Sequence, residues 1–387
     1  MSVRWRVPVC AAVVGGVLLA TGCADFTPQP ENWRAQEELT PQAGPEPHAP
    51  GEPSAPPSTP PSDVPPPNGC TDYDPAVIGT CLDAGFAVAA LPGDGSDPTA
   101  LIGERKSGRI LRVKQGVPAE VVATVQVDAS GDGGLTGLAL SPTFAEDQLI
   151  FAYVTTASDN RLVRIAPGDN PKPILSGIPR GATGNRGTLS TDRKGALLVA
   201  TGNAGNTAAG ADPASLAGKL LRVDPAGQPA AGNPTAGSSV IASGLASPGG
   251  VCTTPDGSAT WVTDRSPTAD LLYRVELGKP LGTAAWRWPD RPGVAGCVAL
   301  PTAVWVATST AGNMQSLALA EDGTFSDKPQ VGLADDNGYG LLGGFDLINE
   351  QVAVFATVNK DGGQPVSSDD RAVVLPLTGG GQSGGPD

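Results

Sequence analysis

The chain has 387 residues, of which 39 are Asp or Glu and 25 are Lys or Arg, so its formal net charge is -14. Because the basic residues form no cluster or stripe, the sequence excludes a typical nucleic-acid-binding protein. Anionic lipid headgroups would also be repelled, so contact with a membrane has to come from a feature other than charge.

Residues 1–22 are predicted to be a secretory signal peptide. A basic start precedes an apolar run over residues 7–20, which is shorter than the roughly 20 residues that a membrane-spanning helix needs. The segment Leu19–Cys23 resembles the bacterial lipobox, which is cleaved before a cysteine that then carries lipid. We therefore expect lipidation at Cys23 and a mature chain anchored by lipid to the extracytoplasmic face of the cell membrane. The alternative is an ordinary signal peptide followed by a chance cysteine.

Residues 23–69 are predicted to be a disordered tether. They are rich in Pro, Glu, Ser and Ala and poor in aliphatic residues, so they cannot bury enough apolar surface to offset chain entropy. Proline runs such as residues 56–61 favour extended polyproline II, which makes the tether a semi-rigid spacer. Residues 379–387 are Gly-rich and are expected to form a flexible tail. The folded domain is therefore expected over residues 70–378.

Six cysteines are present, and four remain after Cys10 leaves with the signal peptide and Cys23 takes the lipid. In an exported, oxidising setting, four cysteines indicate two disulfides with three possible connectivities. The favoured connectivity pairs Cys70 with Cys81 in a local loop and Cys252 with Cys297 across neighbouring repeats. Zinc binding is the weaker alternative, since no CxxC pair exists and the single histidine, His48, lies in the tether.

The folded region contains six repeats of short β-rich segments. The first apolar strand of each repeat follows Gly85, Gly137, Gly187, Gly250, Gly296 or Gly344. Second strands are predicted at residues 101–102, 149–154, 197–200, 261–262, 304–307 and 352–358. Third, alternating strands are predicted at residues 109–113, 161–165, 219–223, 271–275, 316–319 and 372–375. Outer strands are predicted at residues 120–127, 173–175, 239–241, 284–288 and 330–333.

Repeats of this kind are typical of an all-β, six-bladed β-propeller, in which small sheets are arranged radially. The sixth repeat has no outer strand after Leu377, so we expect residues 76–82 to supply it and close the ring. A β-sandwich is the alternative fold, but it would not require a repeated cadence of four strands.

Six short words between residues 104 and 289 occur in an order that resembles the soluble quinoprotein glucose and sorbosone dehydrogenases. The words are Glu104–Ile110, Gly131–Ala139, Ser141–Phe144, Leu175–Pro179, Ala217–Val223 and Trp286–Pro289. The resemblance implies a six-bladed propeller, with pyrroloquinoline quinone and calcium in the active enzymes. The whole chain is still more similar to actinobacterial LppZ-type lipoproteins, which combine a lipobox, a Pro-rich tether and this propeller.

The chain departs from the dehydrogenase pattern at three positions. Where the resemblance implies a catalytic histidine that acts as general base, this chain has Gly184. Where it implies an arginine that pairs with the quinone carboxylates, this chain has Ala246, and Asn203 replaces a carboxylate. These losses predict that the chain needs no cofactor and is not an active sugar dehydrogenase, with pyrroloquinoline quinone and calcium retained only if the enzymatic alternative holds.

The candidate pocket consists of Asp132, Asn185, Arg186 and Asn203. Arg186 could hold an anion, although each of these side chains could instead stabilise a turn. The segment Asp128–Gly133 matches the first half of a calcium loop, but Ala139 stands where the bidentate Glu is needed, so no metal site is expected. Asp264–Arg265 and residues 359–361 are expected to form structural ion pairs near the same pocket, and Trp286 and Trp288 to pack between blades.

Three functions are consistent with the sequence. The favoured hypothesis is an envelope lipoprotein that binds a ligand, either a small sugar-like molecule or a protein. The alternative is a divergent sugar dehydrogenase that uses pyrroloquinoline quinone, with Asp132 or another carboxylate as base. The third is a structural component with an uncharged, shallow mouth, because one fold can host many functions.

Overall fold

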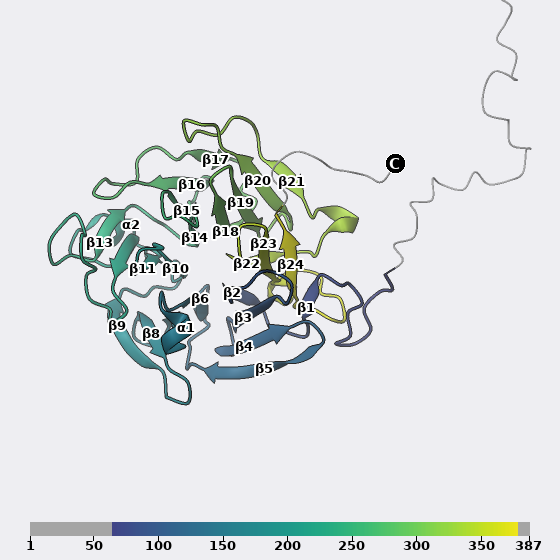
Figure 1. The fold of residues 1–387 in the computed structure, drawn as a ribbon. Helices are drawn as coiled ribbons and strands as arrows, with labels where there is room; N and C mark the ends of the chain where they lie inside the picture. Colours follow the sequence, from purple (N-terminus) through teal and green to yellow (C-terminus); the bar gives the residue numbers. More distant parts are fainter. Residues whose placement is uncertain (1–63, 378–387) are drawn as a thin grey trace, which may run out of the picture. The chain divides into compact units, whose positions relative to one another are not determined.

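Six four-stranded antiparallel sheets surround a central axis in residues 64–377, the part of the chain that the computed structural model describes (Figure 1). The predicted six-bladed β-propeller is therefore confirmed. The expected signal peptide, Cys23, most of the tether and the Gly-rich tail lie outside the described residues. The end of the predicted tether contacts the propeller, because Ser367 Oγ donates a 2.9 Å hydrogen bond to the carbonyl of Pro67.

The first three blades follow one another in the sequence. Blade 1 contains β2 (Gly85–Ala90), β3 (Thr99–Glu104), β4 (Arg109–Lys114) and β5 (Val117–Thr124). Blade 2 contains β6 (Leu135–Leu140), β7 (Ile150–Thr155), β8 (Asn160–Ile165) and β9 (Lys172–Ile178). Blade 3 contains β10 (Gly187–Thr191), β11 (Leu197–Thr201), β12 (Lys219–Val223) and β13 (Val240–Ser243).

The last three blades repeat this order, except that the outermost strand of the sixth comes from the start of the domain. Blade 4 contains β14 (Pro248–Thr253), β15 (Thr260–Arg265), β16 (Asp270–Val275) and β17 (Trp286–Trp288). Blade 5 contains β18 (Val294–Leu300), β19 (Ala303–Thr308), β20 (Met314–Ala318) and β21 (Gln330–Gly332). Blade 6 contains β22 (Leu342–Leu347), β23 (Val352–Thr357), β24 (Ala372–Pro376) and β1 (Val77–Gly79).

The helices between strands are short. They are α1 (Phe144–Asp147), α2 (Thr207–Ala211) and the 3₁₀ turns η2 (Asp335–Asn337) and η3 (Asn359–Asp361). None of the helices within residues 64–377 is long and apolar enough to span a bilayer. Several strands extend beyond their predicted ranges, and β5 begins at Val117 and not at residue 120. Gly116, with φ +70°, makes a turn tight enough for Lys114 to pair with Val117.

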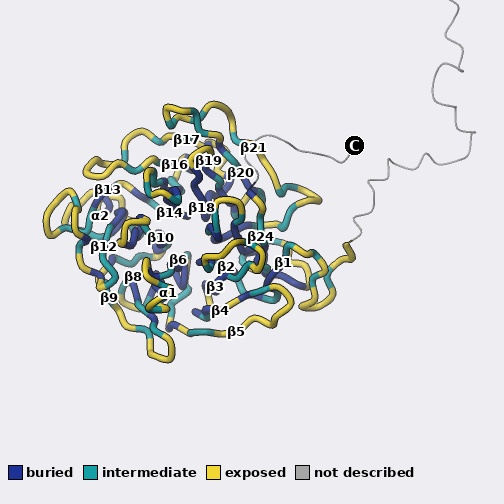
Figure 2. Tube along the Cα trace, viewed as in Figure 1, coloured by how far each residue is buried: buried dark blue, intermediate teal, exposed yellow. Residues whose placement is uncertain are grey.

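Glycines let the inner strands of neighbouring blades approach one another closely. A Cβ atom added to Gly137 would lie 3.0 Å from Thr188 Cα, and one added to Gly250 would lie 2.7 Å from the backbone nitrogen of Cys297. Only a residue without a side chain fits such a contact. The glycine that marks each predicted repeat therefore has a packing role at the axis, and Figure 2 shows buried residues concentrated on the inner strands.

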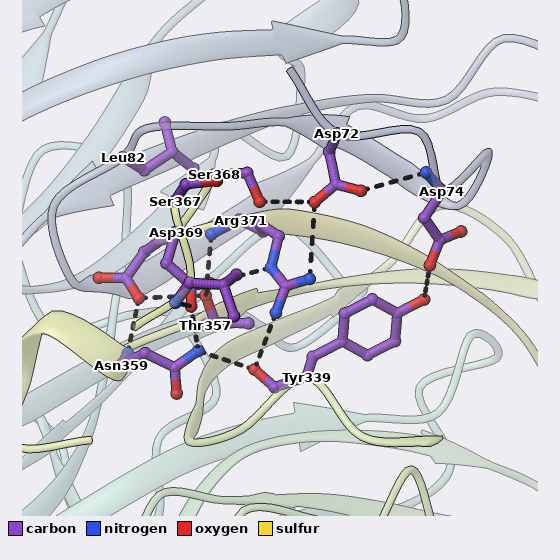
Figure 3. A network of polar contacts seen from close by, with 12 residues as sticks. Asp72, Asp74, Leu82, Tyr339, Thr357, Asn359, Ser367, Ser368, Asp369 and Arg371 are labelled. Atoms are coloured by element: carbon purple, nitrogen blue, oxygen red, sulfur yellow. Dashed lines mark hydrogen bonds and ion pairs between the residues drawn. The ribbon is translucent and has the colours of Figure 1, made fainter. Parts of the chain in front are cut away.

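The ring closes in blade 6, where β1 pairs with β24 and Val77 lies opposite Val373. This confirms that residues 76–82 complete the sheet. A polar network fixes the junction (Figure 3): Asp72 Oδ2 accepts a 2.6 Å hydrogen bond from Ser368 Oγ and lies 3.5 Å from Arg371 Nη1. The first and last segments of the domain are thereby held together.

Both disulfides join the cysteines favoured from the sequence. Cys70 is bonded to Cys81 beside β1, and Cys252 on β14 is bonded to Cys297 on β18, which links blades 4 and 5. Around the second disulfide, Trp288 is buried and Trp286 partly buried in the same apolar cluster, in agreement with their predicted packing role.

Candidate functional site

The sequence-predicted pocket residues meet at one end of the axis, where the inner strands begin. Asp132 precedes β6, Asn185 and Arg186 precede β10, and Asn203 follows β11. The structure thus brings all four to the same mouth of the ring. Their environments differ, and Arg186 alone among them has a charged group with no hydrogen bond or ion pair within residues 64–377.

Asp132 stabilises the loop before β10. Its carboxylate accepts hydrogen bonds from the backbone nitrogens of Gly184 and Asn185, at 2.9 and 3.1 Å, and from Asn185 Nδ2 at 3.2 Å. Three donors on one carboxylate leave little capacity for a proton or a ligand. The structure therefore favours the turn-stabilising interpretation of Asp132.

The side chains of the two asparagines also form hydrogen bonds within the protein. Asn185 is fully buried, and its amide donates to Gly181 O at 2.9 Å as well as to Asp132. Asn203 Oδ1 accepts a 2.9 Å hydrogen bond from the backbone nitrogen of Gly205. Asn185 and the Oδ1 atom of Asn203 therefore hold loops around the mouth, whereas Asn203 Nδ2 makes no hydrogen bond within residues 64–377.

Arg186 is different, because its guanidinium makes no hydrogen bond or ion pair with any residue in the range 64–377. It lies over the Phe86 ring, with Cζ 4.5 Å from the ring centroid, and it is only partly buried. Burial, and then the nearby charge of Arg105, lowers the pKa of Arg186 below its usual range. Five unpaired N–H donors at the axis form a ready site for an anion.

Two further arginines, Arg105 and Arg265, lie near Arg186. The sequence did not single them out as ligand-binding residues. Arg105 donates to both carboxylate oxygens of Asp361, at 3.1 and 2.9 Å, and to the carbonyl of Gly133 at 2.8 Å. This contact joins blade 1 to blade 6 and confirms the ion pair predicted for residues 359–361. The word Glu104–Ile110 was the available signal for Arg105.

Arg265 donates to the carbonyls of Val294 and Gly293, at 2.7 and 2.9 Å. Burial, followed by the charge of Arg186, lowers its pKa to about 9. No ion pair joins Asp264 to Arg265 in the described structure, so the ion pair expected at this position is wrong. The physical reason is that successive residues of β15 point to opposite faces of the sheet.

Asp264 instead anchors the loop before β14. Its Oδ1 atom accepts hydrogen bonds from the backbone nitrogens of Ala246 at 3.0 Å and Ser247 at 2.7 Å. Burial raises the pKa of this carboxyl to about 6, despite those two donors. Asp264 is thus a carboxyl near this mouth that titrates close to neutral pH. Sequence reasoning had assigned it only a structural role.

The backbone at Gly184 excludes a side chain. Its φ is +70°, and a Cβ atom added there would lie 2.6 Å from the backbone nitrogen of Gly205 and 2.8 Å from Asn203 Oδ1. A left-handed conformation and two short contacts both disfavour any other residue. The loop is therefore closed over the position that the resemblance assigned to a histidine.

The predicted half of a calcium loop is held by an ion pair. Asp128 Oδ2 lies 2.7 Å from Arg180 Nη2, and Ala139 is buried within β6. In the described part of the chain, no group of three or more His, Cys, Asp or Glu side chains is arranged to hold a metal ion.

The axis has unequal free space at its two ends. Beside Arg186 and Phe86 the void has a volume of about 10 Å³, enough for a single water molecule. Beyond Phe86, a cavity of about 560 Å³ runs toward the opposite mouth, where the inner strands end. The Arg186–Phe86 pair therefore separates two different spaces.

The six-bladed ring has the fold of the quinoprotein dehydrogenase propellers. The profile of the Glucose / Sorbosone dehydrogenase family matches residues 82–290, more than half of the chain. The chain belongs to this family, as its motifs indicated. The narrower resemblance to LppZ-type lipoproteins stays a prediction.

Solved structures support the same assignment. The PQQ-bound aldose sugar dehydrogenase of Streptomyces coelicolor is similar, with 29% identity, a TM-score of 0.70, and coverage of 78% of this chain and 96% of that chain. An oxidoreductase of Thermus thermophilus, described as a glucose dehydrogenase, has 27% identity, a TM-score of 0.69, and coverage of 77% and 98%.

A curated relative is the aldose sugar dehydrogenase YliI of Escherichia coli K12, which is 26% identical over 228 residues. The match includes 54% of this chain and spans 60% of the length of that relative. Family membership is therefore established more firmly than any shared activity.

Proposed function

We propose that this chain is a lipid-anchored extracytoplasmic propeller that binds a small anionic ligand over Arg186 and does not oxidise sugars. The observation that carries the proposal is the unpaired guanidinium of Arg186 at the axis, beside Arg105 and Arg265. The mouth is cationic although the whole chain has a net charge of -14. An isolated cationic site on an acidic protein favours a specific anion over general attraction of polyanions.

Loss of the dehydrogenase reaction is supported by the backbone at Gly184. Oxidation of a sugar hydroxyl requires a base that removes its proton, and a histidine is suited to this because it titrates near neutral pH. The single histidine of the sequence, His48, is far along the chain from the mouth loops. Since position 184 has no room for a side chain, the base cannot be supplied by a small shift of the loop.

The mouth also fits pyrroloquinoline quinone poorly. A polycarboxylate of this size needs several free cations, and of the three arginines only Arg186 is unpaired. Ala246, at the position where the resemblance places a cofactor-binding arginine, contributes only its backbone: its nitrogen donates to Asp264 and its carbonyl accepts from Asn203. We therefore derive no reaction step for this cofactor.

The competing function is a divergent sugar dehydrogenase that uses pyrroloquinoline quinone. One observation favours it besides the names of the relatives: Asp264, whose pKa is raised to about 6, is a carboxyl able to take a proton near neutral pH. Its lone pairs are shared with the nitrogens of Ala246 and Ser247, which weakens it as a base.

Anchoring through lipid on Cys23 belongs to the same proposal. It rests on the lipobox and on the Pro-rich composition of residues 23–69. A neutral sugar-like molecule or an envelope protein at the mouth are the other possible occupants.

The test is a calorimetric titration of the purified chain with citrate, a tricarboxylate probe. We expect binding that Arg186→Gln weakens roughly tenfold or more, because charge-assisted hydrogen bonds to an anion are lost. Arg112→Gln is the matched control, since Arg112 lies exposed on β4, away from the axis. Citrate binding that is absent, or that both variants weaken equally, would contradict an anion site at Arg186.

A further inference from the structure

A cavity lies at the mouth opposite to Arg186. It has a volume of about 560 Å³, is bounded at its inner end by Phe86, and is lined by the ends of inner strands such as β10 and β22. Cavities of about 300–1,000 Å³ hold small organic ligands. Arg186 does not line this space, although Phe86, on which Arg186 packs, bounds it.

Asp346 supplies a carboxylate to the wall formed by blade 6. Its oxygens accept hydrogen bonds from the backbone nitrogens of Ala90 and Leu347, each at 2.9 Å, and no cation forms an ion pair with it among residues 64–377. Burial raises the pKa of this carboxyl. Because a charge inside a protein is normally paired, an unpaired carboxylate in a cavity is a position for a cationic group of a ligand.

Arg193 supplies the opposite charge from blade 3, which faces blade 6 across a six-membered ring. It follows β10 as an exposed residue that lines the cavity, and its φ of +59° is unusual for a non-glycine residue. Its charge lowers the pKa of Asp346, yet the two side chains form no ion pair in the described structure. The cavity thus has a separated negative and positive group on facing walls.

The surfaces between these charges are suited to a peptide backbone and small apolar side chains. On β10, the hydroxyls of Thr188 and Ser190 line the cavity without a hydrogen-bond partner in residues 64–377. Phe86 provides apolar surface at the inner end of the cavity. Free hydroxyls can pair with a peptide N–H or C=O, and apolar walls can bury a side chain.

We propose that this cavity binds a short peptide with both termini free, whose amino group pairs with Asp346 and whose carboxylate pairs with Arg193. The two charges select for a molecule that carries both an ammonium and a carboxylate group. The site is separate from the anion site at Arg186, so either one can exist without the other.

The test is a calorimetric titration of the full chain with three probes: leucyl-leucine, its N-acetyl derivative and its C-terminal amide. We expect leucyl-leucine to bind at least about tenfold more tightly than either capped form, because each cap removes one charged contact. If leucyl-leucine does not bind, or if a capped form binds equally well, the proposal is overturned.

Variants locate the binding. Arg193→Gln removes the charge that pairs with the peptide carboxylate. In this variant, leucyl-leucine and its amide should therefore bind equally weakly. Ala145→Trp, at an exposed position of α1 on the cavity rim, should block entry, whereas Ala119→Trp on the outer strand β5 should leave binding unchanged. Binding that survives Ala145→Trp would show that the peptide sits elsewhere.

Discussion

The guanidinium of Arg186 lies 4.5 Å from the centre of the Phe86 ring, and this contact separates a cationic mouth from a larger cavity on the same axis. Phe86 comes from the first blade and Arg186 from the loop before the third. A cation over an aromatic face is held by the ring quadrupole without using its N–H donors. The pair therefore positions a guanidinium while leaving it free for a ligand.

Substitution of Gly184 should destabilise the fold far more than substitution of an ordinary left-handed glycine. In Gly168→Ala, where φ is +75° and nothing lies within 4 Å of the added Cβ, we expect a loss of about 1 kcal/mol in the free energy of unfolding. In Gly184→Ala the contacts with Gly205 and Asn203 should raise the loss to about 3 kcal/mol or more. Urea unfolding measures both. Equal losses would show that the loop adapts, which would reopen the position to a catalytic side chain.

Asp132 should behave as a structural carboxylate. Asp132→Ala leaves the backbone nitrogens of Gly184 and Asn185 without an acceptor, so we expect a loss of about 2 kcal/mol in the free energy of unfolding. Asp169→Ala, which removes an exposed ion pair with Lys172, should cost less than about 1 kcal/mol. A variant at 132 that is fully stable but fails to bind citrate would instead assign Asp132 to the ligand.

Asp264 should make stability depend on pH between about 4 and 6. Its pKa is about 6 in the folded protein against an ordinary value of 3.8, so the folded state holds the proton more tightly than the unfolded state in this window. Stability should therefore fall as the pH rises through the window, by up to about 3 kcal/mol from this group.

Asp264→Asn should reduce that slope, as measured by urea unfolding at a series of pH values. The residual slope comes from carboxyls such as Asp346 and Asp370, whose pKa values burial also raises. Asp256→Asn is the control, because hydrogen bonds to Thr254 and Ser258 lower the pKa of Asp256 to about 2, outside the window. An unchanged slope in Asp264→Asn would mean that this carboxyl is ionised throughout.

The two disulfides should contribute unequally. Cys252 and Cys297 are separated by 45 residues and Cys70 and Cys81 by 11. Loop-closure entropy then predicts that the double alanine variant of Cys252 and Cys297 loses about 1 kcal/mol more in the free energy of unfolding than the double alanine variant of Cys70 and Cys81. Thermal unfolding of both variants measures the order. The reverse order would indicate that the Cys70–Cys81 disulfide stabilises the ring closure at β1 by more than the entropy of closing a short loop.

The blades could be predicted from the sequence because each begins with a glycine and an apolar strand, and packing at the axis demands both. Residues 76–82 were identified as the closing strand because the sixth repeat lacked an outer strand. The start of β5 was predicted three residues too far along the chain, because the tight turn at Gly116 depends on its positive φ and not on composition. Local pattern therefore sufficed for the inner strands and failed at turns.

The mouth residues were found through motif order, but their contacts were not. Asp132 and Asn185 look like ligand-binding residues in the sequence and are occupied by backbone donors in the structure. The facing pair Asp346 and Arg193 could not be predicted, because the two lie on blades 6 and 3 and belong to no shared motif. Such pairs become visible only once the ring is closed.

The central claim is that the propeller binds at Arg186 without oxidising sugars, and the most direct test is turnover. The purified chain would be incubated with pyrroloquinoline quinone and calcium, and dye reduction followed with a panel of aldoses. The Streptomyces coelicolor aldose sugar dehydrogenase serves as positive control. We predict no aldose-dependent dye reduction by this chain under conditions where the control reacts. Turnover that is lost in Asp264→Asn would contradict the account and identify Asp264 as the base of a divergent dehydrogenase.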